Sequence, residues 1–260
     1  MPDEAVPQPH RFVAPPHWRA IDFIADLHLS PGLPRTFNAW RDHLLTTSAD
    51  AVFLLGDWFE VWVGDDARSQ PFERRCVEVM RSAATRVAVG VMVGNRDFLI
   101  GDELLADCRA LPLPDPTLLE AFGTRLLASH GDALCLADVD YQQFRQLVRS
   151  AEWQHAFLAK PLAERQHIAA EIRARSAERQ RFDGALWADV DHEAARRWLD
   201  ACGCECLVHG HTHRPARHAI GVGRSREVLS DWDLDQGSRA EVLRWTAAGL
   251  VRLPPERLRP

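Results

Sequence analysis

The sequence predicts an α/β body interrupted by a helical insertion, and three features of the 260-residue chain support this prediction. First, apolar runs of strand length alternate with segments of helical periodicity after the N-terminus, a pattern typical of layered α/β proteins. Second, residues 138–200 show helical periodicity and no convincing strand. Third, strand patterns then return. We therefore expect a body formed by residues 18–137 and 201–260, with an insertion at 138–200.

The elements follow in order from the N-terminus. Residues 1–17 contain five prolines and little apolar periodicity, so we expect a disordered extension. The first strand pattern, WRAIDFIADLHLS, is followed by a helix near residues 35–48. The second, DAVFLLGDWFE, is followed by a helix around residues 70–84. The run RVAVGVMVGNRDF is the third predicted strand.

The rest of the chain completes this plan. TLLEAFGTRLLASHGD has the pattern of a hairpin that turns at Gly123. The insertion then carries two long helical patterns, YQQFRQLVRSAEWQHAFLAK and LAERQHIAAEIRARSAERQ. Strand patterns complete the body in CECLVHGHTHRP, REVLSD and AEVLRWTAAGLVRL.

The composition narrows the classes of function. Apolar residues make up 46% of the chain, which is enough for a substantial core. The net charge of -6 argues against a nucleic-acid-binding protein, because such domains are usually basic. The six cysteines lack the spacing of a small secreted protein and we see no signal peptide, so we expect a cytoplasmic protein. The sequence contains no run of 18 apolar residues, so we expect no membrane span. Binding to a membrane surface stays open.

Five of the predicted strands end at side chains that can bind a metal ion. These are Asp26, His28, Asp57, Asn95, His130, His211 and His213. The stretch GNRDF, residues 94–98, is one example, because a buried strand leads directly into three polar residues. One Gly-Asp turn would be unremarkable, but five such endings are difficult to explain as turns. Sites in layered α/β proteins form beyond the strand ends, so these side chains can converge.

The types of ligand indicate the chemistry. Seven nitrogen and oxygen ligands are too many for one four-coordinate zinc, and they suit two divalent metals about 3.5–4 Å apart with one bridging carboxylate. Imidazole and carboxylate ligands without thiolate favour manganese, iron or zinc over calcium or magnesium. Two such metals can activate a water molecule and hold phosphoryl oxygens. The sequence therefore indicates hydrolysis of a phosphoester or phosphoanhydride.

The blocks DLH, GDWFE, GNRD, HGD and GHTH occur in this order and resemble the calcineurin-like metallophosphoesterases. This resemblance implies a two-layered β-sandwich flanked by helices, here with a helical cap insertion. It also divides the ligands between two metals that share one carboxylate. One metal would be held by Asp26, His28, Asp57 and His213, and the other by Asp57, Asn95, His130 and His211.

Longer strings, such as LGDWFEVWVGDD, GNRDFLIGDELL and VHGHTHRPA, resemble one branch of this family, the UDP-2,3-diacylglucosamine pyrophosphohydrolases of lipid A biosynthesis. The likeness runs from about residue 19 to the C-terminal strands. It implies cleavage of the lipid-linked nucleotide sugar UDP-2,3-diacylglucosamine into UMP and 2,3-diacylglucosamine 1-phosphate, with two Mn²⁺ per chain. Arg96, Asn95 and Asp57 would be catalytic, with the Arg96 guanidinium on the phosphate oxygens. Arg96 could instead pair with Asp97 or a neighbouring acid on the surface. We expect Asp97 to brace the loop by hydrogen bonding.

The insertion has two interpretations. Helical periodicity alone favours a hairpin with one buried apolar stripe and one solvated face. The resemblance favours an acyl-binding cap, beside which basic residues could meet the cytoplasmic face of the inner membrane. It also implies the substrate-binding residues Asn95, Arg96, Asp138, Tyr141, Arg173, Ser176, Gln180 and His211. Gln180 replaces a usual Asn, and Asp183 stands where a Lys is common.

Two other functions stay open. The chain could be a related dinuclear-metal phosphodiesterase or nucleotide-diphosphate hydrolase with a different substrate. It could also be a scaffold that has lost catalysis, although all seven expected ligands are present. We expect no nucleic-acid partner and a monomer.

Overall fold

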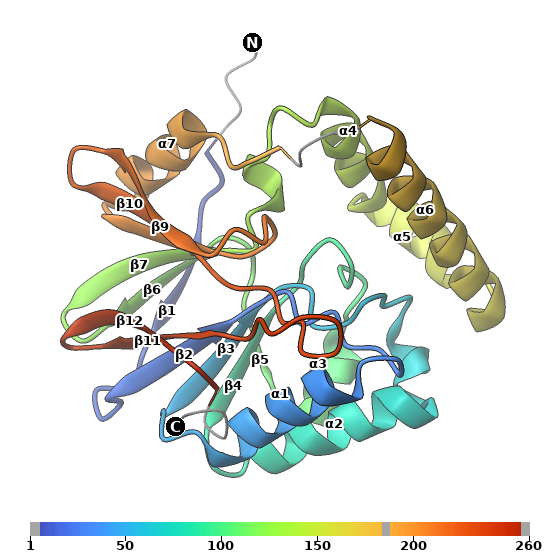
Figure 1. Cartoon of the computed structure of the whole chain (residues 1–260), viewed down its shortest axis with the longest axis horizontal. Helices are drawn as coiled ribbons and strands as arrows, with labels where there is room; N and C mark the ends of the chain where they lie inside the picture. Colours follow the sequence, from blue (N-terminus) through green and yellow to red (C-terminus); the bar gives the residue numbers. More distant parts are fainter. Residues whose placement is uncertain (1–5, 184–187, 256–260) are drawn as a thin grey trace.

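The computed structural model describes residues 6–183 and 188–255, with only the backbone at residues 176, 177 and 179–183. Two six-stranded sheets face each other, as the resemblance predicted (Figure 1). The first sheet has the order β1-β6-β7-β8-β10-β9, and its strands are β1 (His10–Val13), β6 (Thr117–Ala121), β7 (Thr124–Ser129), β8 (Cys206–His209), β10 (Arg224–Val228) and β9 (Ala216–Gly221). The second has the order β12-β11-β2-β3-β4-β5, and its strands are β12 (Gly249–Leu253), β11 (Val242–Thr246), β2 (Ala20–Ile24), β3 (Ala51–Leu55), β4 (Ala88–Met92) and β5 (Leu111–Pro112).

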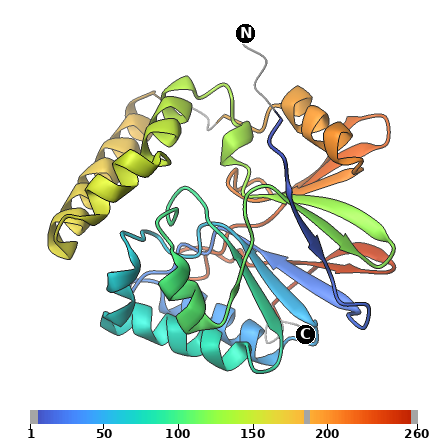
Figure 2. The ribbon, with the colours of Figure 1, turned by 180° about the vertical axis from the view of Figure 1, so that it is seen from behind.

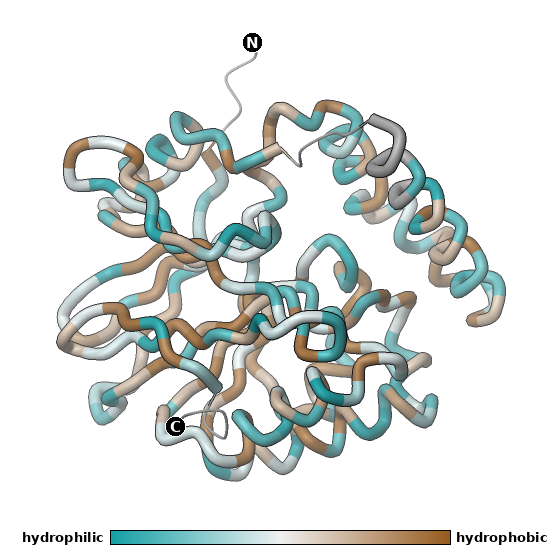
Figure 3. The backbone as a smooth tube through the Cα atoms, viewed as in Figure 1, coloured by the Kyte–Doolittle hydropathy of each residue, from teal (hydrophilic) through white to brown (hydrophobic). Residues whose placement is uncertain are grey.

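The central strands β2 and β3 are buried along their whole length because both faces of their sheet are covered. They pair in parallel, with Ile21 opposite Ala51. Alternate side chains point to opposite faces of a strand. Ile21 and Phe23 therefore join the apolar layer between the two sheets. Ile24 joins the layer under the helices instead. Figure 3 shows apolar segments along these central strands.

Helices cover the outer face of each sheet. Those over the second sheet are α1 (Pro34–Thr46), α2 (Pro71–Ala83) and α3 (Asp102–Cys108). Both α1 and α2 begin with a proline in the first turn, where the missing N–H costs nothing. Trp40 and Met80 fill the layer between these helices and the strands. Helix α7 (His192–Cys202) covers the first sheet and packs Leu199 against β7 and β8.

Helices α4 (Val139–Val148), α5 (Ala151–Leu158) and α6 (Leu162–Asp183) lie together on one side of the body (Figures 1 and 2). We call these three helices the cap. Phe157 joins the apolar layer of the body and stacks on Trp153, with ring centroids 4.7 Å apart. Arg165 is buried and donates hydrogen bonds to Val63 and Asp66, which fixes α6 to the body. None of the helices in the described ranges is long and apolar enough to cross a bilayer.

The structure differs from the sequence predictions near the N-terminus. The prediction that residues 1–17 are disordered is wrong at β1, which pairs in parallel with β6. Phe12 packs edge-on against Phe53 at 5.4 Å, and Arg11 makes a bidentate contact with Glu120. These contacts hold β1 in the sheet although its segment contains few apolar residues. Residues 1–5 of that prediction lie outside the described residues.

Other differences concern short or peripheral elements. Helix α7 begins inside the predicted 138–200 insertion, yet it packs on the sheet of the body. Strand β9 and helix α3 were not predicted. The strand has an exposed, polar edge pattern, and the helix has only seven residues. The predicted hairpin at Gly123 is confirmed by the antiparallel pairing of β6 and β7.

Candidate metal centre

The seven predicted ligands lie just beyond five strands. Strands β2, β3 and β4 are parallel, and β7 and β8 are parallel in the opposite sheet, so the carboxyl ends within each group share an edge. Asp26 and His28 follow β2, Asp57 follows β3, Asn95 follows β4, His130 follows β7, and His211 and His213 follow β8. Two sheet edges therefore bring together side chains that are up to 187 positions apart in the sequence.

The backbone at this edge is unusual. Seven non-glycine residues in the described ranges have a positive φ, and five of them are predicted ligands: Asp26, His28, Asp57, His211 and His213. A residue with a side chain in this conformation costs on the order of 1–3 kcal/mol and needs support from its surroundings. The concentration of strain at these residues is typical of a functional site.

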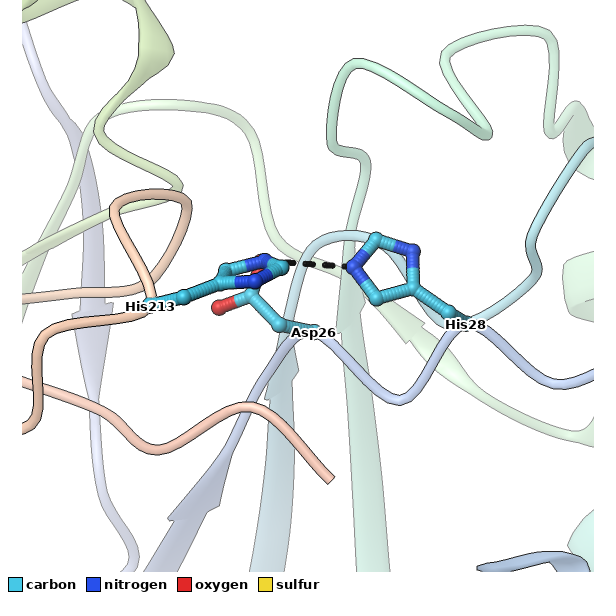
Figure 4. A group of neighbouring side chains, drawn as sticks. All are labelled: Asp26, His28 and His213. Atoms are coloured by element: carbon cyan, nitrogen blue, oxygen red, sulfur yellow. Dashed lines mark hydrogen bonds and ion pairs between the residues drawn. The ribbon is translucent and has the colours of Figure 1, made fainter. Parts of the chain in front are cut away.

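The first ligand group consists of Asp26, His28 and His213 (Figure 4). The Nε2 atoms of His28 and His213 are 3.3 Å apart, and His213 Nε2 is 3.5 Å from Oδ1 of Asp26. Ligands bound at about 2.0–2.2 Å to one metal, and at right angles, are about 3 Å apart. These three atoms therefore have the spacing of neighbours around a single ion.

The second group lies on the other side of Asp57. His130 Nε2 is 3.0 Å from Asn95 Oδ1, and His211 Nδ1 is 2.8 Å from the same oxygen. Oδ1 of Asp57 lies 3.7 Å from His130, and Oδ2 lies 3.9 Å from Nε2 of His28. Asp57 thus presents one oxygen to each group, as a bridging carboxylate would.

The charge of the site fits a bound cation. Asp26 and Asp57 are buried, and within the described residues their ion pairs are all with histidines. A buried carboxylate needs a positive partner. Burial raises the pKa of Asp26, but the hydrogen bond from His213 lowers it well below its usual range. The donor set therefore favours divalent metals over an uncharged ligand.

The two histidines of the second group differ in their surroundings. Burial lowers the pKa of His130, but the charges of Asp57 and Asp132 raise it to about 9. Burial and the neighbouring His130 lower the pKa of His211 to about 4. His130 Nδ1 lies 3.0 Å from the carbonyl oxygen of Leu55, which directs Nε2 towards Asn95. Such a contact on the second nitrogen orients a metal-binding imidazole.

Two glycines make room for the carboxylates. A Cβ atom on Gly94 would lie 2.1 Å from Oδ1 of Asp57, and one on Gly210 would lie 2.4 Å from Oδ2 of Asp26. The glycines of GNRD and GHTH are therefore required by close approach to the ligands. Asp97 accepts hydrogen bonds from the backbone N–H of Gly94 and of Trp58, both at 2.7 Å. The prediction that Asp97 braces this loop is confirmed.

Arg96 lies at the open side of the centre. It lines a pocket together with His28, Asp57, Asn95, His211, Thr212 and His213. Its backbone N–H donates to Asp57 Oδ1 at 2.8 Å. The alternative pairing with Asp97 is not observed, because the Asp97 carboxylate is buried against backbone N–H groups. The guanidinium is therefore available to an anion in the pocket.

The predicted substrate residues of the cap differ in position. The ring of Tyr141 stacks on His211 at 5.8 Å, which brings α4 to the metal centre. Arg173 donates to the backbone and side chain of Glu60, and Glu60 Oε2 lies 3.1 Å from Nδ1 of His28. Asp138 is the N-cap of α4 and accepts from the N–H of Tyr141 at 3.1 Å. The predictions for Ser176 and Gln180 lie outside the described side chains.

Sequence reasoning missed two carboxylates beside the ligands. Glu60 lies between His28 and the cap, and Asp132 lies between His130 and the cap. Each belongs to a block that was otherwise recognised, Glu60 to GDWFE and Asp132 to HGD. Their positions, two or three residues after a predicted ligand, were the sequence signal that could have identified them.

This fold and this set of ligands define a metal-dependent phosphoesterase. The family model described as "Calcineurin-like phosphoesterase" matches residues 20–215, and the chain belongs to that family. The family acts with divalent metals, and the two clusters above contain the candidate ligands.

Curated relatives are similar over nearly the whole chain. The UDP-2,3-diacylglucosamine hydrolase of Chromobacterium violaceum is 45% identical over 243 residues, which cover 90% of this chain and 98% of the relative. Proteins with the same name from Ralstonia nicotianae and Bordetella pertussis are 42% and 43% identical. Those alignments cover 83% and 85% of this chain and 84% and 86% of the relatives.

Proposed function

We propose that this chain hydrolyses the pyrophosphate bond of UDP-2,3-diacylglucosamine, giving UMP and 2,3-diacylglucosamine 1-phosphate in lipid A biosynthesis. The observation that carries this proposal is the 45% identity to a UDP-2,3-diacylglucosamine hydrolase over 98% of that relative. The ligand clusters and the cap lie within residues 20–215, the range that the family model matches. The proposal therefore concerns the region that holds both the candidate ligands and the cap.

The proposed cofactors are two divalent cations per chain, with Mn²⁺ as the expected metal. One would be held by Asp26, His28, Asp57 and His213, and the other by Asp57, Asn95, His130 and His211. When bound, the cations supply an activated water and a charge that neutralises phosphoryl oxygens.

The residues of the chain then orient the substrate. Asn95 is held between His130 and His211, so its amide cannot rotate freely. Arg96 directs up to two N–H groups at a phosphate, a geometry that guanidinium shares with no other side chain. Because the loop beneath Arg96 is fixed by Asp97, this donor is in position before the charge develops.

The cap would bind the sugar and the acyl chains. Tyr141 stacks on His211, and Arg173 pairs with Glu60, which contacts His28, so both residues lie beside the predicted ligands. Arg173 must leave Glu60 to reach a phosphate. Val139, Leu147 and Leu158 are large apolar side chains that stay exposed on the cap. Exposed apolar groups of this kind are suited to acyl chains or to a lipid surface. We propose a monomer that acts at the cytoplasmic face of the inner membrane.

The direct test is to compare UDP-2,3-diacylglucosamine with UDP-glucose and bis-p-nitrophenyl phosphate as substrates. We expect release of UMP from the acylated sugar at the highest kcat/KM, abolished by a chelator and restored by Mn²⁺. Equal kcat/KM for the acylated sugar and UDP-glucose would contradict the proposal and favour a nucleotide-diphosphate hydrolase. Binding to lipid vesicles would test the proposed membrane association, and sedimentation would separately test whether the protein is a monomer.

A further inference from the structure

Asp132 connects the metal centre to the cap. It lies two residues after His130 and is completely buried. Its Oδ2 atom accepts hydrogen bonds from the hydroxyl of Tyr141 at 2.7 Å and from Nε of Arg145 at 2.8 Å. Nη2 of Arg149 is 3.6 Å from the same oxygen. The three donors are four residues apart, so they share one face of α4 and its C-cap.

The same face of α4 contacts the other ligand loops. Nη2 of Arg149 donates to the carbonyl oxygen of Gly94 at 3.0 Å, next to Asn95. The ring of Tyr141 stacks on His211 with an angle of 30° between the planes. One helix face is therefore in contact with three loops that carry predicted ligands.

Apolar packing contributes little to the position of α4. Val148 is its only buried residue, whereas Val139 and Leu147 are 59% and 56% exposed. A helix of ten residues with one buried apolar side chain depends on polar contacts for its placement. Asp132 provides the acceptor that these polar contacts share.

We infer that Asp132 is a positioning residue: it fixes α4 against the metal centre and so sets where Tyr141 meets the substrate. This inference rests on the proposed function, because it matters for a substrate that reaches both the metals and the cap. A small diester that contacts the metals alone should depend far less on Asp132. Asp132 acts through the position of its carboxylate between the loop that carries His130 and helix α4. Asp132 itself does not touch the reacting atoms.

The first test measures position without measuring activity. The chain contains one tyrosine, so protein labelled with 3-fluorotyrosine gives one ¹⁹F resonance, from Tyr141. We expect Asp132→Asn to shift or broaden this resonance and to accelerate amide hydrogen exchange across α4. Asp22→Asn is the matched control, because Asp22 is also buried and bound to an arginine, Arg244, but lies on β2 away from the cap. If both variants leave the resonance and the exchange of α4 unchanged, the inference is wrong.

The second test separates substrate positioning from general damage. For UDP-2,3-diacylglucosamine, Asp132→Asn should lower kcat/KM about 10²-fold, the order of loss expected when a group that contacts the substrate is misplaced. The loss should lie mainly in KM, because the cap contacts hold the substrate as well as the transition state. Hydrolysis of bis-p-nitrophenyl phosphate and metal content should change no more than in Asp22→Asn. An equal loss for both substrates would mean that Asp132 supports only the ligand loop.

A third variant keeps the inference testable if Asp132→Asn does not fold. Arg145→Gln removes one donor at the solvent side of the network and should produce a smaller change of the same kind. In the double variant the two effects should not add, because both act through one contact. If the wild-type protein does not cleave UDP-2,3-diacylglucosamine, the proposed function fails, but the ¹⁹F and exchange results still decide the role of Asp132.

Discussion

Replacing Gly94 with alanine should disable the metal centre without unfolding the protein. The added Cβ atom would lie 2.1 Å from Oδ1 of Asp57 and 2.5 Å from the backbone nitrogen of Asp57. To reach ordinary contact at 3.4–4 Å, the carboxylate or the loop must move by more than 1 Å. Overpacking of this kind costs about 1–3 kcal/mol in stability. A shift of about 1 Å in a catalytic group costs about 10² in rate.

The assay is hydrolysis of bis-p-nitrophenyl phosphate, together with metal content and thermal unfolding in the presence of a chelator. We expect kcat/KM to fall at least about 10²-fold, with reduced retention of metal. Gly32→Ala is the control, because a Cβ atom there meets nothing within 4 Å. If Gly94→Ala keeps the metal content and kcat/KM of Gly32→Ala, Asp57 does not need its present position and the reasoning about a bridging carboxylate fails.

Four further predictions concern single side chains. The Arg96→Ala variant should retain its metals but lose about 10²–10³ in kcat, as expected when a preorganised donor to an anion is removed. Unchanged kinetics would contradict the proposed contact between Arg96 and phosphate. Hydrogen bonds from Arg244 and His43 outweigh burial and lower the pKa of Asp22 to about 2. The stabilisation is therefore present above the unfolded pKa near 3.8 and is lost as the pH falls towards 2. Denaturant titrations should show that the wild type loses about 2 kcal/mol over this window and that Asp22→Asn does not. Phe157→Ala should cost about 3–5 kcal/mol in urea unfolding, because Phe157 is buried. Leu158→Asp should cost less stability than Phe157→Ala because Leu158 is 43% exposed, and an unaltered kcat/KM for the acylated sugar would exclude it from the acyl site.

The last two predictions concern Phe157 and Leu158, two neighbouring residues that the sequence analysis did not distinguish. The two interpretations of the insertion, an acyl-binding cap or a hairpin with a buried stripe, did not distinguish Phe157 from Leu158. The structure buries Phe157 with Trp153 against the body and leaves Leu158 exposed. Phe157 therefore attaches the cap to the body, and the proposed acyl-binding role in α5 leaves Leu158 as its candidate.

The amino-acid sequence determined the types of the candidate ligands and the ends of the strands at which they lie. Apolar runs that stop at Asp, Asn or His are visible without coordinates, because strands buried on both faces give continuous apolar runs and a core rejects these polar side chains. The glycines of GNRD and GHTH were visible too, and their reason is the close approach of Asp57 and Asp26. The sandwich came from resemblance, since local pattern gives no order of strands in a sheet.

Tertiary structure decided everything that depends on distant neighbours. Strand β1 forms because β6 and Phe53, more than 40 positions away, supply its partners. His130 and His211 are the same residue type, and burial lowers the pKa of both. Neighbouring carboxylates outweigh burial at His130 and raise its pKa to about 9, whereas burial together with the facing His130 lowers the pKa of His211 to about 4. Asp132 reads as part of a turn in the sequence, and only the packing of α4 makes it a connection between cap and metal centre. Side-chain identity is local, whereas electrostatic environment and helix placement are set by contacts between segments far apart in the chain.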